Sequence, residues 1–354
     1  MPAAAAPKSH LFAAYKPAFP KVTWPPLEEV PIVERGSSAD IRKSALLSAA
    51  DKITHLSSAI GTEVSGIDLR ELSNEQKDEL ALLVAQRGVV FFKNQDLNIH
   101  EQLDLGRYFG PLHKHANAAV PVRPGLEEVN VVYRDGSTDK EGYTSLFTKQ
   151  DLWHSDVSYE RQPPGITSLK LLTGPQFGGD TVWNSSYALY SSLSPGMQVY
   201  LEGLKALHVD SSNRTPRRAP VETVHPVVRV HPVKGWKSIF VCPAFTTRII
   251  GIPKAESDAI LEFLFSQIAT NPEFQVRFRW EPSSKSVAIW DNRVVTHTAT
   301  LDYWPATRHG LRVTPHAEKP LSVQEYEERT GKKAVDRLRD REHWGLDTKA
   351  PAYL

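Results

Sequence analysis

The sequence predicts a mainly β domain, either a barrel or a jelly-roll sandwich, with a few helices inserted between its strands. Short runs rich in β-branched and aromatic residues recur from residue 166 onward, which is typical of many short strands. Only a few helical stretches interrupt these runs. The chain has 354 residues and 40% hydrophobic content, which is enough to bury a large core in one barrel-type domain.

The elements before residue 111 are expected to be two helices with a strand between them. Ser73 and Gln76 have the spacing of a capping box, and Gly88 stands where the helix they begin would end. Residues 89–92 are β-branched and aromatic, which predicts a buried strand. A second helix is expected over residues 100–109, with Asn98 as its cap.

Residues 111–150 mix Pro, Gly, Asp and Ser, so they are expected to form a long loop region with one short strand at 129–133. A helix is expected to begin at Ser194, with Pro195 in its first turn, and another to cover about 254–270. A charged segment at about 322–345 has a helical pattern. The later strands are expected at 166–172, 181–183, 227–230, 238–241 and 287–290.

Composition divides the chain into an extended Pro/Ala-rich arm (1–45), a main domain (46–320) and a charged, helical tail (321–354). The arm lacks the apolar core of a secretory signal, and no run approaches the roughly 18 apolar residues of a membrane span. An organelle-targeting segment is the weaker alternative, because the first 21 residues carry three lysines and no acid.

Charge and cysteine content restrict the class of partner. The formal net charge of +1 leaves no basic field for nucleic acid. A single cysteine, Cys242, rules out an intramolecular disulfide and fits a reducing compartment. We therefore expect a cytoplasmic protein whose partner is a small molecule, without nucleic acid or membrane.

The sharpest local feature is His154-Ser155-Asp156. Residues two apart in an extended segment point to the same side, so His154 and Asp156 can present an imidazole and a carboxylate to one point. His297 is the candidate third ligand. Two histidines and one carboxylate leave coordination positions open, as in non-haem iron oxygenases. Taken alone, a hydrogen-bonded His–Asp pair is the simpler interpretation.

Two arginines strengthen the metal-site interpretation. Arg308 and Arg312 follow His297 after 11 and 15 residues. A guanidinium offers a planar fork to a carboxylate, which a dicarboxylate cosubstrate requires. A surface salt bridge is the alternative for either arginine.

With these residues, the chain resembles the taurine/sulfonate and phenoxyacetate (TauD/TfdA) family of iron(II)/2-oxoglutarate-dependent dioxygenases, and most of all its fungal sulfonate dioxygenases. The resemblance runs from about Gly61 to about Pro315. The matching stretches are residues 153–157, 178–181, 225–232, 245–248 and 289–293.

The resemblance implies a double-stranded β-helix, that is, a jelly roll with helices packed outside. It implies that His154, Asp156 and His297 hold iron and form the catalytic centre. It also implies that Arg308 and Thr181 bind the cosubstrate 2-oxoglutarate. Dioxygen is the second cosubstrate, and ascorbate would support activity.

For the main substrate, the resemblance implies that Arg312 and His115 hold an acidic group and that Val157 and Phe245 line the pocket. The implied reaction hydroxylates a small organic acid, foremost an alkylsulfonate, which then releases an aldehyde and sulfite. Succinate and CO2 are the coproducts. The family also commonly forms dimers or tetramers.

Two positions depart from the taurine enzymes, because Ala118 and Gln150 stand where those enzymes carry a tyrosine and an asparagine. An alanine leaves more room and removes a hydroxyl, so a larger or more apolar acid than taurine is expected. A carboxylate, an aryloxy acid, a sulfate ester and a secondary metabolite remain alternative substrates. A zinc hydrolase and a catalytically silent metal-binding jelly roll remain alternative functions.

Overall fold

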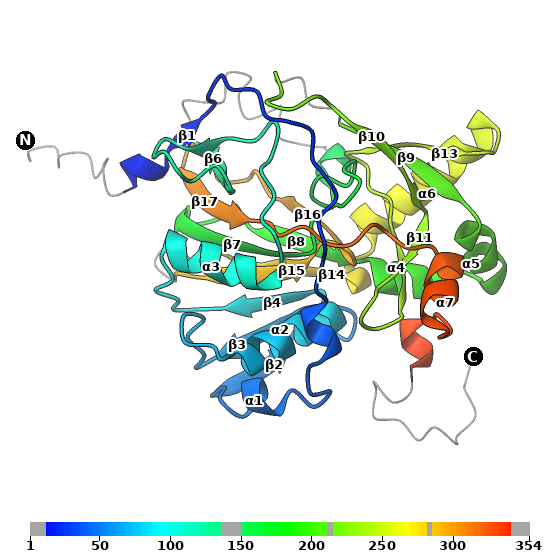
Figure 1. Cartoon of the computed structure of the whole chain (residues 1–354), viewed down its shortest axis with the longest axis horizontal. Coiled ribbons are helices and arrows are strands. Elements are labelled where there is room, and N and C mark those ends of the chain that lie inside the picture. Colours follow the sequence, from blue (N-terminus) through cyan, green and yellow to red (C-terminus); the bar gives the residue numbers. More distant parts are fainter. Residues whose placement is uncertain (1–11, 136–149, 211–214, 282–284, 341–354) are drawn as a thin grey trace, which may run out of the picture.

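The computed structural model describes residues 12–135, 150–210, 215–281 and 285–340. A seven-stranded sheet runs through the middle of the molecule (Figure 1), and all its neighbouring strands are antiparallel except β3 and β4. Its order is β2 (Lys52–His55), β3 (Thr62–Ser65), β4 (Val89–Phe92), β15 (Val287–Asp291), β7 (Ile166–Thr173), β17 (Arg308–Val313) and β6 (Val129–Arg134).

A three-stranded sheet packs against one face of the large sheet. Its order is β14 (Gln275–Phe278), β8 (Thr181–Ser185) and β16 (Val295–Ala299). Because side chains alternate along a strand, Phe91 of β4 points into the space between the sheets, where it contacts Trp183 and Phe278. The two facing sheets with their apolar filling form the jelly-roll core expected from the sequence.

Helices cover the outer face of the large sheet. These are α2 (Asn74–Arg87) and α3 (Ile99–Phe109), and both begin with a capping box. The box at Ser73 was predicted, whereas Asn98 was predicted only as a cap. Val90 and Phe92, which alternate with the inward residues of β4, pack in one cluster with the apolar side of α2. β4 is therefore buried on both faces, which explains its unbroken apolar sequence.

A second group of elements flanks the small sheet and carries its own apolar core. It contains a three-stranded sheet of β10 (Glu222–Pro226), β9 (Lys205–Val209) and β13 (Thr246–Ile250). Figure 1 shows α6 beside this sheet. The helices of this half are α4 (Ser186–Ser192), α5 (Pro195–Glu202) and α6 (Lys254–Thr270).

The remaining elements are short. They are α1 (Ser44–Leu47), α7 (Val323–Thr330), the pair β1 (Pro17–Ala18) and β5 (Val120–Pro121), the pair β11 (Val228–Val230) and β12 (Lys237–Ile239), and 3-10 helices at Ala13–Tyr15, Arg35–Ser37, Gln150–Leu152, Pro272–Phe274 and Arg337–Arg339.

The predicted helix at 322–345 is shorter than expected. It covers Val323–Thr330 and ends at Gly331, whose φ of 68° lies in the left-handed region, so the chain leaves the helix there. Positions 341–345 of that prediction lie outside the described residues, as do 1–11 of the arm and 136–149 of the long loop. The division into arm, domain and tail stays a prediction. Among the described helices, none has the length and apolar character needed to cross a membrane.

Candidate active centre

The backbone brings His154 and His297 together although they are far apart in sequence. The two residues face each other in an antiparallel bridge, with hydrogen bonds from His154 N to His297 O (3.0 Å) and from His297 N to His154 O (2.8 Å). Directly opposed residues of an antiparallel pair point to the same side. Their imidazole ring centroids accordingly lie 4.3 Å apart.

Asp156 joins the two imidazoles because it lies two residues beyond His154. Its Oδ1 is 3.5 Å from Nε2 of His154 and 3.8 Å from Nε2 of His297. Each of the three residues offers one ligand atom, and these atoms lie within 4.8 Å of one another. Among the described residues, this is the group of histidine, cysteine and acidic side chains that could hold a metal ion.

The orientation of the three groups suits metal binding. Nδ1 of His154 lies 2.7 Å from the carbonyl oxygen of Leu152, so Nδ1 is the hydrogen-bond donor and Nε2 is the ring nitrogen that faces Asp156. Burial lowers the pKa of His297 well below its usual value. Burial would raise the pKa of Asp156, but the guanidinium of Arg312 holds it well below its ordinary range. The donor set therefore consists of one ring nitrogen from each histidine and one carboxylate.

Asn292 anchors the segment that carries Asp156. Its Oδ1 accepts hydrogen bonds from the backbone N–H of Asp156 (3.1 Å) and from Nε1 of Trp290 (3.0 Å). Its carbonyl oxygen accepts from Oγ of Ser155 at 2.6 Å. The side chain is 1% exposed, so these bonds are shielded from water. Asn292 was part of the recognised motif, but the sequence did not reveal this positioning contact.

Arg308 and Thr181, the two candidate 2-oxoglutarate residues, are in direct contact. The guanidinium of Arg308 donates from Nε to the carbonyl of Gly179 (2.9 Å) and from Nη2 to Oγ1 of Thr181 (3.0 Å), which also accepts from Nε1 of Trp280. Arg308 is 3% exposed, and burial lowers its pKa. Its hydrogen-bond acceptors among the described residues are neutral, so a buried positive charge is available to an anionic ligand.

Arg312 lies on the same face of β17 as Arg308, because strand residues at even spacing share a face. It does not stand free in the pocket. Its Nη1 donates to Oδ1 of Asp156 at 2.5 Å, on the oxygen that faces the two imidazoles. The candidate substrate arginine and the candidate metal ligand are therefore in direct contact.

His115 belongs to the same electrostatic environment. Burial lowers the pKa of His115 well below its usual value, and the charges of Arg312 and Asp156 act on it in opposite directions. Its Nδ1 accepts hydrogen bonds from the backbone N–H groups of Asn117 (3.1 Å) and Ala118 (3.2 Å). The proton of the neutral ring is therefore on Nε2, which makes that atom a hydrogen-bond donor.

Phe245 and Val157, the candidate apolar residues of the substrate pocket, lie beside the metal ligands His154 and Asp156. The ring centroid of Phe245 is 6.2 Å from that of His154 and 5.0 Å from that of Tyr159, in edge-to-face contacts. Val157 is 3% exposed and follows Asp156 with a φ of 40°. A positive φ strains a β-branched residue, and such strain concentrates at functional sites. Gln150, by contrast, is exposed in the 3-10 helix before His154.

The loop that carries His115 is held by residues that the sequence did not single out. Arg217 donates from Nη2 to the carbonyl oxygens of His115 (2.8 Å) and Ala118, and Arg218 donates from Nη1 to that of Lys114 (3.1 Å). Both arginines are 5% exposed. Nothing local marks them in the sequence, because their partners are backbone atoms about a hundred residues away.

The residues present fit iron(II). Two neutral imidazole nitrogens and one carboxylate oxygen are the donor set of non-haem iron oxygenases, and they leave positions open for cosubstrate and dioxygen. Two buried atoms of the group, Oδ2 of Asp156 and Nδ1 of His297, have no hydrogen-bond partner among the described residues. A buried carboxylate with one unsatisfied oxygen is suited to a cation.

The fold and this centre define a non-haem iron oxygenase of the jelly-roll class, and the comparisons name its family. The family model described as "Taurine catabolism dioxygenase TauD, TfdA family" matches residues 52–314. The chain belongs to this family. It is a 2-oxoglutarate-dependent dioxygenase, and it uses iron(II), 2-oxoglutarate and dioxygen to act on a small molecule.

Similar proteins match most of the chain. An alpha-ketoglutarate-dependent sulfonate dioxygenase of Saccharomyces cerevisiae is 39% identical over 76% of this chain and 68% of its own length. The alpha-ketoglutarate-dependent dioxygenase cnsP of Penicillium expansum is 39% identical over 84% of this chain and 86% of its own length. The crystal structure of a taurine dioxygenase from Burkholderia xenovorans matches with a TM-score of 0.66 at 30% identity, over 77% of this chain and 93% of that one.

Proposed function

We propose that the chain is a sulfonate dioxygenase that hydroxylates an alkylsulfonate at the carbon beside sulfur. Its iron ligands are His154, Asp156 and His297, Arg308 and Thr181 bind 2-oxoglutarate, and Arg312 and His115 bind the sulfonate. The observation that carries the proposal is the contact of Arg312 with Asp156, because it places a cationic anchor for an acid next to the metal ligands. The yeast relative, a sulfonate dioxygenase, supports this substrate class.

Bound iron(II) supplies the activation of dioxygen that is coupled to conversion of 2-oxoglutarate into succinate and CO2. Arg308 offers its buried charge to the distal carboxylate of 2-oxoglutarate, and the hydroxyl of Thr181 adds a hydrogen bond. Arg312 and the Nε2–H of His115 hold the sulfonate oxygens and thereby fix which carbon faces the metal ligands. A carbon hydroxylated beside sulfur then loses sulfite and becomes an aldehyde.

The apolar surroundings support a substrate with more hydrocarbon than taurine. Phe245 and Tyr159 pack edge to face beside His154, and Val157 is buried next to Asp156. Ala118 contributes no hydroxyl, and the carbonyl of Ala118 is already bound by Arg217. An amine such as that of taurine has no dedicated partner among these residues, whereas an alkyl chain is well accommodated.

The test is a substrate panel. The purified protein with iron(II), ascorbate and 2-oxoglutarate is offered alkylsulfonates, sulfate esters and aryloxyacetates, and succinate and sulfite are measured separately. We expect both products in equal amounts with an alkylsulfonate of several carbons. Succinate with a sulfate ester or an aryloxyacetate, but no turnover of any alkylsulfonate, would overturn the proposed substrate.

Ligand variants test the centre itself. His154→Ala and Asp156→Ala are expected to abolish turnover, because each removes one of three ligands. His100→Ala, an exposed histidine on α3, is the matched control and should behave like the wild type. Full activity of both ligand variants would refute the assignment of the centre.

A further inference from the structure

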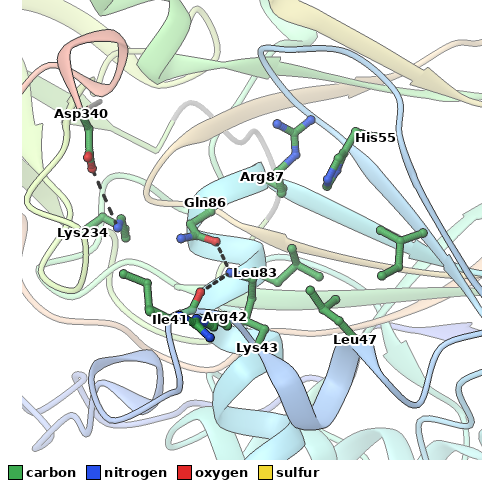
Figure 2. Close-up of a pocket in the computed structure, with 11 residues that line it drawn as sticks. Ile41, Arg42, Lys43, Leu47, His55, Leu83, Gln86, Arg87, Lys234 and Asp340 are labelled. Carbon is green, nitrogen blue, oxygen red and sulfur yellow. Dashed lines mark hydrogen bonds and ion pairs between the residues drawn. The ribbon is translucent and has the colours of Figure 1, made fainter. Parts of the chain in front are cut away.

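A cavity of about 820 Å³ lies away from the candidate active centre and shares no lining residue with it. Figure 2 shows Lys234 and Asp340 at one end of it, and Leu47 and His55 at the other. Cavities of about 300–1,000 Å³ are the usual size of small-molecule sites. The residues that line it are Ile41, Arg42, Lys43, Leu47, Ile53, His55, Leu83, Gln86, Arg87, Lys234 and Asp340.

The charge of the lining is strongly unbalanced. Arg42, Lys43, Arg87 and Lys234 are cationic, and Asp340 is the acid among the lining residues. A partly enclosed space with walls of one charge concentrates ions of the opposite charge. The cavity is therefore predisposed toward an anion.

Lys43 is the central group of the cavity wall. It is 9% exposed, and its ammonium donates to the carbonyl of Ile41 (2.8 Å) and to Oε1 of Gln86 (2.9 Å), both of them neutral. An ammonium has three donors, and the third has no partner among the described residues. Burial lowers the pKa of Lys43, Lys234 lowers it further, and Glu79 opposes this. The buried charge therefore lacks a bonded anionic partner.

Arg87 adds a second buried charge without an acid. It is 7% exposed, and its guanidinium donates only to neutral oxygens within the described chain: the carbonyls of Ser57, Ser58 and Gly61 and the hydroxyl of Thr62. Burial lowers the pKa of Arg87 to about 10. Most N–H donors of Arg87 already make hydrogen bonds within the protein. Arg87 therefore adds positive charge to the wall, and an anion would be bound directly by the lysines.

Lys234 faces the cavity with a loosely held ammonium. Its Nζ is 4.0 Å from Oδ2 of Asp340, beyond hydrogen-bond distance, and 4.7 Å from the ring centroid of Trp236. Arg42 is exposed at the rim. Both side chains can turn toward a ligand without breaking a strong bond.

We propose that this cavity binds a small organic oxyanion with a doubly charged head group, such as a phosphate ester or phosphonate. The head lies between Lys43 and Lys234, where a dianion relieves the repulsion of the two ammonium groups. The apolar body of the ligand packs against Leu47, Ile53 and Leu83. The site is separate from the centre that performs the oxidation.

Isothermal titration calorimetry of the full chain with hexylphosphonate tests this proposal. Arg42→Gln combined with Lys234→Gln should weaken binding at least tenfold without loss of folding, because Arg42 is exposed and Lys234 makes no hydrogen bond that a glutamine would break. Lys52→Gln is the matched control and should bind like the wild type, since Lys52 is exposed on the neighbouring β2 but does not line the cavity. Circular dichroism melts of each variant verify the fold.

Two further titrations distinguish this cavity from the active centre and test the organic part of the ligand. Hexylphosphonate also resembles the proposed sulfonate, so the titrations are repeated in the Arg312→Gln background, which alters the candidate active centre but no residue of the cavity lining. Saturable binding that persists in Arg312→Gln and is weakened when Arg42→Gln and Lys234→Gln are added supports the second site, whereas loss of all binding in Arg312→Gln would overturn it. Inorganic phosphate should bind at least tenfold more weakly than hexylphosphonate if the apolar wall contributes, and equal affinities would overturn the organic ligand. Absence of saturable binding at about 1 mM would overturn the proposal altogether.

Discussion

Nη1 of Arg312 donates to Oδ1 of Asp156 at 2.5 Å, and this same oxygen faces the imidazoles of His154 and His297. One carboxylate oxygen thus links the candidate anchor for the acidic substrate to the candidate metal ligands. Placement of the substrate acid and the charge of the metal centre are therefore physically coupled.

Arg312→Gln is the direct test of this coupling. The variant should lower kcat/KM for the sulfonate by an amount equivalent to about 2–5 kcal/mol, because a partly buried charged anchor is lost. Steady-state succinate formation at varied sulfonate concentration measures the effect. The slow turnover of 2-oxoglutarate without sulfonate is the internal control and should persist. Equal loss of both activities would show that Arg312 serves the metal centre and not the substrate.

Local patterns in the sequence were sufficient for the elements that carry their own signal. The capping boxes at Ser73 and Asn98 begin the two outer helices, and residues 89–92 form the buried strand as predicted. The spacing of His154 and Asp156 also determines that they face one side. These features depend on neighbours in sequence, so they can be recognised without knowledge of the fold.

The strands that complete the centre carry no such signal. β16, with the sequence VTHTA, and β17, with RHGLRV, have too few apolar residues to predict buried strands. They form because β8 and β7 pair with them through long-range hydrogen bonds. The bridge between His154 and His297 is of the same kind. The metal ligands could be proposed from the family motif, but their positioning contacts, such as those of Asn292, required the fold.

Asn292 is expected to control metal affinity without being a ligand. Asn292→Ala removes the acceptor for the N–H of Asp156 and should weaken metal binding by about 10–100-fold, the usual effect of losing a supporting contact around a metal site. Titration with cobalt(II), followed by absorbance, measures this affinity without any turnover. Asn74→Ala on the exposed start of α2 is the control. Unchanged cobalt affinity in Asn292→Ala would contradict the positioning role.

Asp291 is expected to stabilise the turn that precedes His297. It is 0% exposed and pairs with Nε2 of His231 (3.0 Å) and Nη2 of Arg293 (2.7 Å). Asp291→Asn leaves Arg293 with less compensation and should cost about 3–5 kcal/mol of unfolding free energy, measured with urea. Asp104→Asn, whose exposed carboxylate pairs with Arg107 on α3, is the control and should cost about 0–1 kcal/mol.

The ion pairs of Asp291 also predict that stability depends on pH. Burial would raise the pKa of Asp291, but Arg293 and His231 lower it below its ordinary value, so the folded state releases this proton more readily than the unfolded state. The contribution of Asp291 is therefore present above the unfolded pKa of about 4 and decreases as the pH falls below it. The stability difference between wild type and Asp291→Asn should shrink as the pH falls from about 6, above the unfolded pKa, to about 3, below it. A difference that grows on acidification would contradict this sign.

Arg217, which holds the loop that carries His115, is expected to link the N-terminal arm to substrate affinity. Arg217 donates to the carbonyl oxygens of His115 and Ala118, stacks over Trp24 at 4.7 Å and accepts from the N–H of Trp24 through its own carbonyl (2.6 Å). The arm thus supports the loop that carries the candidate sulfonate donor. Since His115 is the proposed sulfonate donor, displacement of this loop is expected to change substrate binding and to leave metal binding unchanged.

Arg217→Met should raise KM for the sulfonate about tenfold, because two partly buried carbonyls lose a charged donor worth about 1–3 kcal/mol. Trp24→Ala should act in the same direction and more weakly, since it removes the stacking but leaves the hydrogen bonds of Arg217. In both variants kcat and the affinity for cobalt(II) are expected to match the wild type. Arg123→Met, an exposed arginine on the neighbouring loop, is the control. A fall in kcat with unchanged KM would instead show that Arg217 supports the metal centre.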